Sequence, residues 1–530
     1  MATTKKLQHR NLPSLPSETI DDIFKHIHDQ STLHTCLFVN RAWCRKIVAI
    51  LWARPRPLVY KERSSKSLIE TYVSCFDDEE KAILFSEESS NKEYLELKSP
   101  FFEYSAFLKE LNYPLLRMAV RRCYRNLGSK EFSRKIKPNK PDLNPNRQVT
   151  IMKALCKLFV RTSHLDSLVL DSYDDLPSVG LFTKGQPYFT NLNKLIIHWT
   201  NTATNISGLV KRLPQICTGI RHLVVEFGID DELEAENLAS IIRAQQSITT
   251  FELTGTRNRV LSILTAIEET QTESLTSVKF SRVDYQWKSL DILGKCSKLR
   301  SLDMISDGPT SEGYISDEPT TVAKGSSFNL RSLKLSKQSP KLSAQVIRMG
   351  GISLKKLWLN TISPEIVSSI LRSGTRVTHL YLDISETPQL DFSQHLKVIG
   401  GLRLNYLQLS SITPNDINNL LTAMTTTVPS TLRHLDLEQE FSLRFVGSFL
   451  KDCKAPLEEL TLFPNMAIDT SYLTEIIGYA KGKSSLKFLH LNLSWESGLV
   501  NGRFTRAMTK ELQKNIFTVD LGKLRGEEVQ

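Results

Sequence analysis

A six-residue pattern of apolar positions recurs along most of the chain. In each copy the first, fourth and sixth residues are apolar, and most of the residues between them are polar. Successive copies are about 27 residues apart on average, which lies within the range of periods found in solenoid repeats. The thirteen copies begin at residues 165, 192, 220, 248, 275, 299, 330, 354, 377, 404, 432, 457 and 486. The even spacing predicts a body of stacked, similar units.

Each copy predicts a short strand, and the stretch that follows it predicts a helix. The last three positions of the hexamer alternate between apolar and polar, as in a strand with one buried face. The stretches 363–374 and 413–424 begin with Ser363 and Thr413, which are good N-cap residues, and a proline follows each cap. The expected apolar helix faces are Ile366, Ile370 and Leu371 in the first and Ile417, Leu420 and Leu421 in the second.

The repeat resembles the leucine-rich repeat, whose units of about 20–29 residues carry this spacing of apolar positions. Residues 151–515 are therefore expected to form an α/β solenoid of about 13 strand–helix units. Cys217, Cys296 and Cys453 each lie three or four residues before a hexamer, which resembles the cysteine-containing subclass of these repeats. We expect these thiols to be buried packing residues.

The N-terminal segment 12–52 has a different pattern, which predicts three short helices. Possible helix caps are Ser17, the polar segment 29–32 and Asn40. Behind these caps apolar residues recur at helical spacing. The expected faces are Ile20, Ile23, Phe24 and Ile27 in the first helix, Leu33, Cys36 and Leu37 in the second, and Trp43, Ile47, Ile50 and Leu51 in the third.

These three helices carry more large apolar residues than a core of about 40 residues can use. A surplus of this kind has two explanations. The apolar face either binds a partner protein or packs against adjacent helices of the same chain. The residues alone leave both explanations open.

Residues 11–54 resemble an F-box. A Leu-Pro start, an acidic residue, an apolar helix, a central Trp motif and a closing Leu-Trp pair stand in order. The matching residues are Leu15, Pro16, Glu18, Ile20, Ile23, Phe24, the run CLFVNRAWCR at 36–45, Leu51 and Trp52. Asn40 stands where many F-boxes have cysteine. An F-box followed by leucine-rich repeats resembles the organisation of the fungal F-box/leucine-rich-repeat family.

The resemblance implies a substrate-recognition subunit of an SCF-type (Skp–cullin–F-box) E3 ubiquitin ligase. The F-box would bind a Skp-type adaptor and, through it, a cullin–RING ligase, while the repeats would bind an unidentified protein substrate. The positions that match adaptor contacts of the family are Leu15, Pro16, Ile20, Ile23, Leu37, Val39 and Trp43. Some of these must instead form the core of the helices.

The open face of the predicted sheet is the expected substrate surface. On each strand, the residues flanking the second apolar position point away from the core. The expected substrate-binding residues are Trp358, His379, Tyr381, Tyr406, Gln408, His434 and Asp436. Because neighbouring strands lie about 4.8 Å apart, Trp358, Tyr381 and Tyr406 would form a row of exposed aromatic rings, which are favoured interface anchors. Alternatively, these aromatics are there only as good strand formers.

Residues 55–150 are expected to form a partly helical basic linker, and residues 516–530 a C-terminal tail. Within the linker, 67–76 and 103–112 predict amphipathic helices. Arginines cluster from Arg117 to Arg125, and the net charge of the chain is +11. A solvated connector explains these charges; a localisation signal or a patch for an acidic partner are the alternatives.

Several classes of function lack support in the sequence. The eight cysteines include no C-x-x-C pair, and no metalloprotease, serine-hydrolase or phosphate-binding loop motif occurs. We therefore expect a non-catalytic protein without metal or cofactor. No uncharged apolar run of about 20 residues and no secretory leader is evident, so we expect no membrane association and an intracellular protein, cytoplasmic, nuclear or both.

Two alternatives to the ligase receptor stay open. One is an interaction scaffold that holds a Skp-type adaptor without a cullin. The other is a basic solenoid that binds RNA or another polyanion, for which the net charge is the only support. We do not expect a nucleic-acid partner.

Overall fold

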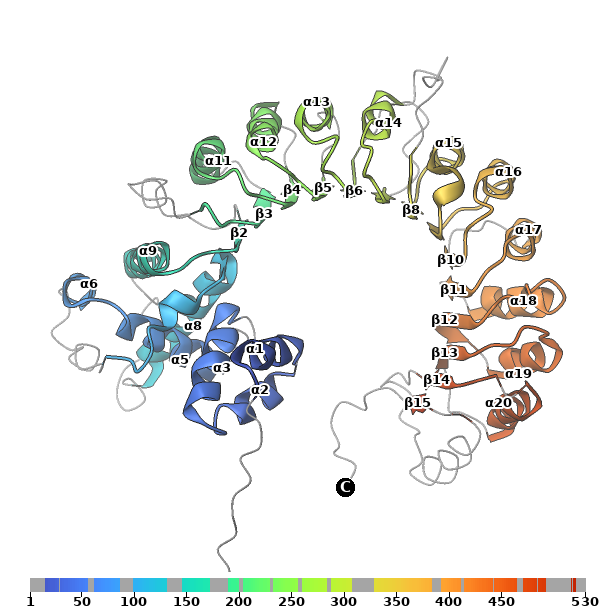
Figure 1. Cartoon of the computed structure of the whole chain (residues 1–530), viewed down its shortest axis with the longest axis horizontal. Helices are drawn as coiled ribbons and strands as arrows, with labels where there is room; N and C mark the ends of the chain where they lie inside the picture. Colours follow the sequence, from blue (N-terminus) through green and yellow to red (C-terminus); the bar gives the residue numbers. More distant parts are fainter. Residues whose placement is uncertain are drawn as a thin grey trace, which may run out of the picture. The chain divides into compact units, whose positions relative to one another are not determined.

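Strands and helices alternate along the chain, as the repeat pattern predicts (Figure 1). The computed structural model describes residues 15–27, 29–55, 62–85, 99–130, 145–171, 189–199, 204–228, 232–255, 260–283, 287–306, 328–383, 392–410, 414–441, 443–464, 470–483, 485–491, 516 and 518–520. The chain divides into two compact units, Met1–Val224 and Val225–Gln530, and the boundary between them falls within one strand of the repeats. The domain limits expected at residues 54, 150 and 515 stay a prediction.

The first unit begins with three short helices, α1 (Ser17–His26), α2 (Gln30–Cys36) and α3 (Arg41–Ala53). Helix α5 (Glu62–Ser74) confirms the helix expected over 67–76. The other elements of this unit are α6 (Asp78–Phe85), η1 (Tyr104–Phe107), β1 (Glu110–Asn112), α8 (Tyr113–Lys130), α9 (Pro145–Thr162), β2 (Ser167–Asp171), β3 (Lys194–Trp199), α11 (Thr204–Ile216) and β4 (His222–Phe227), which continues into the second unit.

The helix expected over 103–112 is wrong, because this stretch holds a single 3-10 turn followed by a strand. Strand β1 pairs in parallel with β2, with Leu111 opposite Leu168. Leu108, Leu111 and Tyr113 are buried and repeat the apolar spacing of the hexamers. The pair at i and i+3 suits a helix as well as this strand motif, so spacing alone could not separate them. The sheet therefore begins inside the range 55–150 that was expected to be a linker.

The second unit consists of strands that alternate with helices. Its strands are β5 (Thr250–Thr254), β6 (Ser277–Ser281), β7 (Ser301–Ile305), β8 (Ser332–Ser336), β9 (Lys356–Leu359), β10 (His379–Asp383), β11 (Tyr406–Ser410), β12 (His434–Phe441), β13 (Glu459–Pro464), β14 (Phe488–Leu491) and β15 (Thr518–Asp520). Its helices are α12 (Glu232–Ala244), α13 (Val260–Thr270), α14 (Trp287–Gly294), α15 (Pro340–Gly350), η2 (Gly351–Ser353), α16 (Pro364–Ser373), α17 (Ser393–Gly401), α18 (Pro414–Met424), α19 (Leu443–Asp452) and α20 (Thr470–Lys483).

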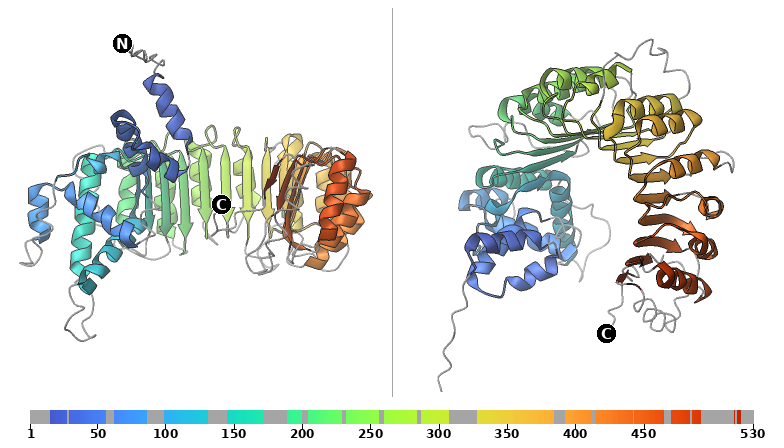
Figure 2. Two further views of the ribbon diagram at one scale, coloured as in Figure 1. Left: turned by 90° about the horizontal axis from the view of Figure 1, so that it is seen from below. Right: turned by 45° about the vertical axis from the view of Figure 1, so that its right-hand side comes forward.

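Strands β5 to β15 are neighbours in chain order and pair in parallel. Figures 1 and 2 show the helices of this unit along one side of these strands. Parallel neighbours require a crossover connection, which these helices supply. The fourth and sixth hexamer positions are buried, as at Leu380 and Leu382, and the residues between them are half-buried on the other face. Strand β15 lies within 516–530, the range expected to be a tail.

The helix starts expected between the strands are confirmed where the structure describes them. Ser363 accepts a hydrogen bond from the Ile366 N–H and caps α16, whereas Thr413 lies outside the described residues. Ile417, Leu420 and Leu421 are all buried on α18. Leu371 was wrongly placed on the buried face of α16, because it is 38% exposed. It lies one residue beyond Ile370, or about 100° further around the helix.

At the N-terminus, two of the three expected caps are confirmed. Asp29 accepts hydrogen bonds from the Ser31 and Thr32 N–H groups, and Asn40 Oδ1 accepts from the Trp43 N–H at 2.9 Å. The cap expected at Ser17 is wrong. Pro16 is the capping residue, its carbonyl accepting from the Ile20 N–H at 3.2 Å, and Ser17 is the first helical residue.

Substituting Asn40 with alanine is expected to lower the free energy of unfolding of the three-helix segment by about 1 kcal/mol, because α3 loses its side-chain cap. Hydrogen exchange of the α3 amides in the full-length chain measures this change. Asn40→Asp is the control, since aspartate retains the acceptor. Equal protection in the alanine variant and the natural protein would contradict this role of Asn40.

The thiols expected to be packing residues are buried. Cys217, Cys296 and Cys453 are each at most 4% exposed. Burial raises the pKa of all three and brings that of Cys296 to about 11. A protonated, enclosed thiol is a poor nucleophile, so these residues act as small apolar side chains. In the described part of the chain, no helix is both long and apolar enough to cross a membrane.

Candidate functional site

The three N-terminal helices enclose a small core of their own. Phe24, Leu33 and Ile47 are buried there, and Ile20, Leu37 and Trp43 are among the partly buried residues that pack against them. The Trp43 ring meets the Phe24 ring edge-on, with centroids 5.0 Å apart. Three of the seven expected adaptor residues, Ile20, Leu37 and Trp43, therefore belong to this core and support the surface from beneath.

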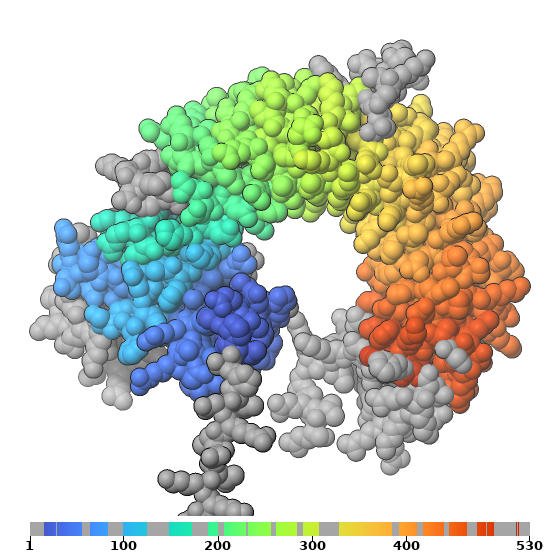
Figure 3. All heavy atoms as spheres, in the orientation of Figure 1, coloured from blue at the N-terminus to red at the C-terminus, as the bar shows by residue number. Residues whose placement is uncertain are grey.

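The other four expected adaptor residues are exposed. Leu15, Pro16, Ile23 and Val39 all lie at the surface. In the space-filling view of Figure 3, the dark-blue helices α1 to α3 form a rounded protrusion of the first unit. We call the exposed residues Leu15, Pro16, Ile23, Phe38 and Val39 the apolar N-terminal surface.

Phe38 is the member of this surface that the sequence reasoning did not include. It lies in the turn between α2 and α3, is 79% exposed, and contacts only the edge of the His34 ring among the aromatic side chains described. One feature of the sequence could have indicated it. Three successive apolar residues, Leu37, Phe38 and Val39, precede the Asn40 cap, and three neighbours in a turn cannot all face one core.

The C-terminal end of α3 packs on the rest of the first unit. The Trp52 ring lies 4.4 Å from that of Tyr104 and 5.5 Å from that of Tyr72. The Lys109 N–H donates to the Ala53 carbonyl at 3.0 Å, immediately before β1. The explanation by packing within the chain is therefore confirmed for Trp52. The apolar N-terminal surface stays exposed, and a partner for it stays a prediction.

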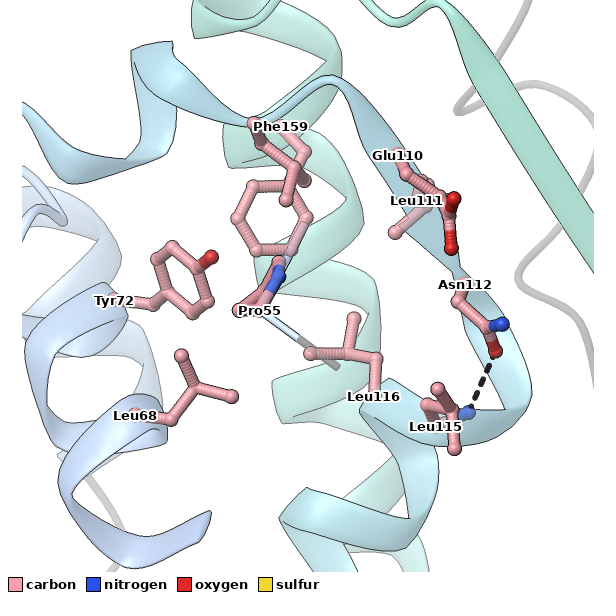
Figure 4. Close-up of a pocket in the computed structure, with 10 residues that line it drawn as sticks. Pro55, Leu68, Tyr72, Glu110, Leu111, Asn112, Leu115, Leu116 and Phe159 are labelled. Carbon is pink, nitrogen blue, oxygen red and sulfur yellow. Dashed lines mark hydrogen bonds between the residues drawn. The ribbon is translucent and has the colours of Figure 1, made fainter. Parts of the chain in front are cut away.

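A small apolar cavity lies next to this junction. Figure 4 shows the side chains of Pro55, Leu68, Tyr72 and Phe159 around it, and the hydrogen bond from the Leu115 N–H to Asn112 Oδ1 at its rim. Its volume is about 30 Å³, far below the roughly 300–1,000 Å³ of small-molecule sites. We interpret it as a packing gap, since it has no room for a ligand.

The Tyr72 hydroxyl is buried in this region and has no hydrogen-bond partner. Burial raises its pKa. Replacing Tyr72 with phenylalanine is therefore expected to raise the free energy of unfolding by about 1 kcal/mol, because an unsatisfied buried polar group costs about 1–3 kcal/mol. Urea unfolding of the full chain measures the change. A loss of stability would show that the hydroxyl has a bonding role.

Few of the arginines between Arg117 and Arg125 are described as exposed and available to a partner. Arg121 is exposed, but Arg117 and Arg122 are half-buried and each has an interaction partner. The side chain of Arg125 and the basic stretch 131–144 lie outside the described residues. The alternatives for this region stay open.

The expected substrate residues form two adjacent rows on the open face of the second unit. In the first row, Trp358 lies opposite Tyr381, which lies opposite Gln408, which lies opposite Asp436. In the second row, His379, Tyr406 and His434 are opposite one another. All seven side chains are half-buried. The strand pairing thus brings the whole expected set together, while its role in binding stays a prediction.

The aromatic members of these rows contact one another. Trp358 and Tyr381 are stacked with centroids 3.9 Å apart and planes 10° apart. Tyr406 is tilted by 40° against Tyr381, with centroids 5.0 Å apart, and is stacked on His379 at 5.8 Å. These contacts restrain the side chains, so the surface is largely preformed.

A hydrogen-bonded group adjoins the aromatic rings. The Tyr406 hydroxyl lies 3.0 Å from both Gln408 Oε1 and Asp436 Oδ2 and can donate its proton to either. The other Asp436 oxygen, Oδ1, is buried and has no hydrogen-bond partner. Burial raises the pKa of Asp436. Burial also raises the pKa of Tyr406, and the neighbouring carboxylate adds to this effect.

Charged side chains flank the aromatic rows on both sides. On β12 to β14, Glu459 lies 3.0 Å from His434 Nδ1 and 3.3 Å from His490 Nε2. On β5 to β8, the first row continues as Glu252, Lys279, Asp303 and Lys334, whose signs alternate. Burial raises the pKa of Asp303, and the lysines on both neighbouring strands oppose that rise. The lysines of this row therefore have carboxylate neighbours.

A groove of about 460 Å³ opens beside the first row. Its walls are Trp358 and Tyr381 together with other residues in or directly after strands β8 to β12. The polar lining residues are Lys334, Ser336, Asn360, Asp383, Gln408, Ser410 and Glu438. Both its volume and its mixture of aromatic and polar walls are typical of binding sites. Within the described residues, no group of three His, Cys, Asp or Glu side chains could hold a metal ion.

The fold is a leucine-rich-repeat solenoid of the α/β class, preceded by a three-helix segment. No protein-family model and no curated protein matches the sequence. Solved structures that are distantly similar include the following two. The leucine-rich-repeat-containing protein LegL7 from Legionella pneumophila has a TM-score of 0.34 and 12% identity, over 58% of this chain and 96% of that one. The Rad7–Elc1 complex from yeast has a TM-score of 0.32 and 14% identity, over 73% of this chain and 90% of that one.

Proposed function

We propose that this protein is the substrate-recognition subunit of an SCF-type E3 ubiquitin ligase. The observation that carries the proposal is the apolar N-terminal surface on a segment that resembles an F-box. Leu15, Ile23, Phe38 and Val39 are all large, apolar and exposed. Several large, exposed apolar side chains on one small unit favour a protein partner. A Skp-type adaptor is the partner implied by the resemblance.

The residues of this surface divide into two roles. Leu15, Pro16, Ile23, Phe38 and Val39 contact the adaptor. Ile20, Leu37 and Trp43 hold that surface in place, because they pack on the core of Phe24, Leu33 and Ile47. Aromatic residues at an interface often contribute most of the binding energy. Phe38 is therefore the residue of this surface that we expect to contribute most to adaptor binding.

The protein itself contributes binding and proximity rather than chemistry. The adaptor connects it to a cullin–RING ligase, and the repeats hold the substrate on their open face. A tethered substrate meets the transfer machinery at a raised effective concentration. Trp52 packs on Tyr72 and Tyr104 and so holds α3 against the rest of the first unit. The adaptor surface is therefore not joined to the repeats by a flexible linker alone.

The test is affinity purification of the full-length chain after co-expression with a Skp-type adaptor and a cullin. Recovery of both partners is the expected result. Recovery of the adaptor without the cullin would identify an interaction scaffold instead, and recovery of neither would contradict the proposal. Binding to RNA with a steep dependence on salt would favour the polyanion alternative.

A further inference from the structure

The groove on the open face of the second unit is rich in hydrogen-bond acceptors. Asp383 is the last residue of β10, Glu438 lies within β12, and Ser336, Ser410 and Gln408 add neutral oxygens. A carboxylate can only accept hydrogen bonds, whereas a guanidinium carries five N–H donors and no acceptor. The lining therefore favours a ligand that brings donors.

Asp436 lies beside the groove without being part of its lining. Its Oδ1 atom is buried and has no hydrogen-bond partner, although the Tyr406 hydroxyl lies 3.0 Å from Oδ2. A buried acceptor without a donor is costly. It lies in the same row as Gln408, which lines the groove. The contact of Asp436 Oδ2 with the Tyr406 hydroxyl helps to hold the Tyr406 ring against Tyr381, which is a wall of the groove.

The positive charge in the groove does not oppose a cationic ligand strongly. Lys334 is the one cationic residue of the lining. It lies directly opposite Asp303 on the next strand, and its charge lowers the pKa of that carboxyl against the effect of burial. Asp383 and Glu438 outnumber it in the lining, and the groove is locally acidic in a chain whose net charge is +11.

The stacked rings supply the apolar part of the site. Trp358 and Tyr381 both line the groove and hold each other parallel at 3.9 Å. A long cationic side chain buries its aliphatic stem against such a wall while its charged end reaches polar groups. A planar guanidinium also stacks on aromatic rings more readily than an ammonium does.

We propose that this groove binds an arginine side chain of the protein substrate, with the stem on Trp358 and Tyr381 and the guanidinium at Asp383 and Glu438, the two carboxylates of its lining. This inference rests on the proposed function, since it names the chemistry of the substrate that the receptor would hold. An acidic or phosphorylated segment does not fit, because Asp383, Asp436 and Glu438 would repel it.

The test uses the full-length protein and a fluorescein-labelled peptide in which two arginines are flanked by glycine and serine. Fluorescence anisotropy compares it with the same peptide carrying citrulline, which retains the shape but not the charge. The arginine peptide is expected to bind at least about tenfold more tightly. Because the whole chain is positive, general electrostatics oppose this binding, and any affinity reports a local site. No adaptor is present, so failure here is separate from failure of the proposed function.

Variants of the groove locate the binding. Asp383→Asn and Glu438→Gln each replace a carboxylate of the lining with an amide of the same shape. Each is expected to weaken binding of the arginine peptide by about tenfold or more. Glu252→Gln is the matched control on the same sheet face and is expected to change nothing. Equal affinity for the arginine and citrulline peptides would overturn the inference. So would unchanged binding in both groove variants, or a dissociation constant weaker than about 1 mM.

Discussion

Replacing Phe38 with alanine is expected to weaken binding of a Skp-type adaptor by about thirtyfold or more. Phe38 is 79% exposed, so its removal costs the fold little. In a complex it would become a buried aromatic anchor, and such residues contribute about 2 kcal/mol or more. Calorimetric titration of the full-length variant with the purified adaptor measures the loss.

Phe101 provides the matched control for this substitution. It belongs to the same unit, is 94% exposed and lies outside the F-box-like segment. Phe101→Ala is expected to leave adaptor affinity unchanged. If both variants bind like the natural protein, the adaptor does not use the apolar N-terminal surface, and the assignment of Leu15, Ile23 and Val39 fails with it.

Replacing Leu380 with alanine is expected to lower the free energy of unfolding of the second unit by about 2–5 kcal/mol. Leu380 is fully buried and lies opposite Leu357 and Leu407 on the neighbouring strands, which are fully buried as well. The helices close this side of the sheet, so the vacated volume cannot be filled by solvent without further cost. Urea unfolding of the full chain measures the shift.

Tyr381, the next residue, provides the comparison within one strand. It points to the open face, and its loss removes the ring contacts with Trp358 and Tyr406. Such contacts are worth about 0.5–1.5 kcal/mol each, so Tyr381→Ala is expected to lower the free energy of unfolding less than Leu380→Ala does. Tyr381→Ala is also expected to weaken binding of the arginine peptide. The reverse order of stabilities would contradict the strand orientation described.

The repeats could be predicted from the sequence because their period is short and their alternation strict. An apolar residue at each fourth and sixth hexamer position must be buried, and every strand from β2 to β14 lies at a predicted hexamer. The two strands at the ends of the array, β1 and β15, were missed. Leu108 lies two periods before the first predicted copy, and Ile516 begins a hexamer inside the expected tail.

The N-terminal surface was less predictable, because a motif locates a segment without showing which side faces solvent. Ile20 and Ile23 are one helical turn apart, yet only Ile20 packs on the Phe24 core. The difference depends on the angle at which α1 meets α3, which spacing along the chain does not contain. Phe38 was missed for a similar reason, since turns carry no periodicity.

On the open face, too, some features could be predicted from the sequence and others could not. Residue-by-residue alternation was enough to place Trp358, Tyr381, Gln408 and Asp436 in one row. The approach of Tyr406 to Asp436 joins different rows on adjacent strands and depends on side-chain rotamers. The unpartnered Asp436 oxygen beside the groove was therefore visible only in the structure.

The most direct test of the account is the titration of the full-length natural chain with a purified Skp-type adaptor. The account predicts a one-to-one complex with a dissociation constant below about 1 μM, which Phe38→Ala weakens and Phe101→Ala does not. No binding by a folded, monodisperse chain would contradict it. The three helices would then serve only to pack on the rest of the first unit, as Trp52 does, and the ligase assignment would be wrong.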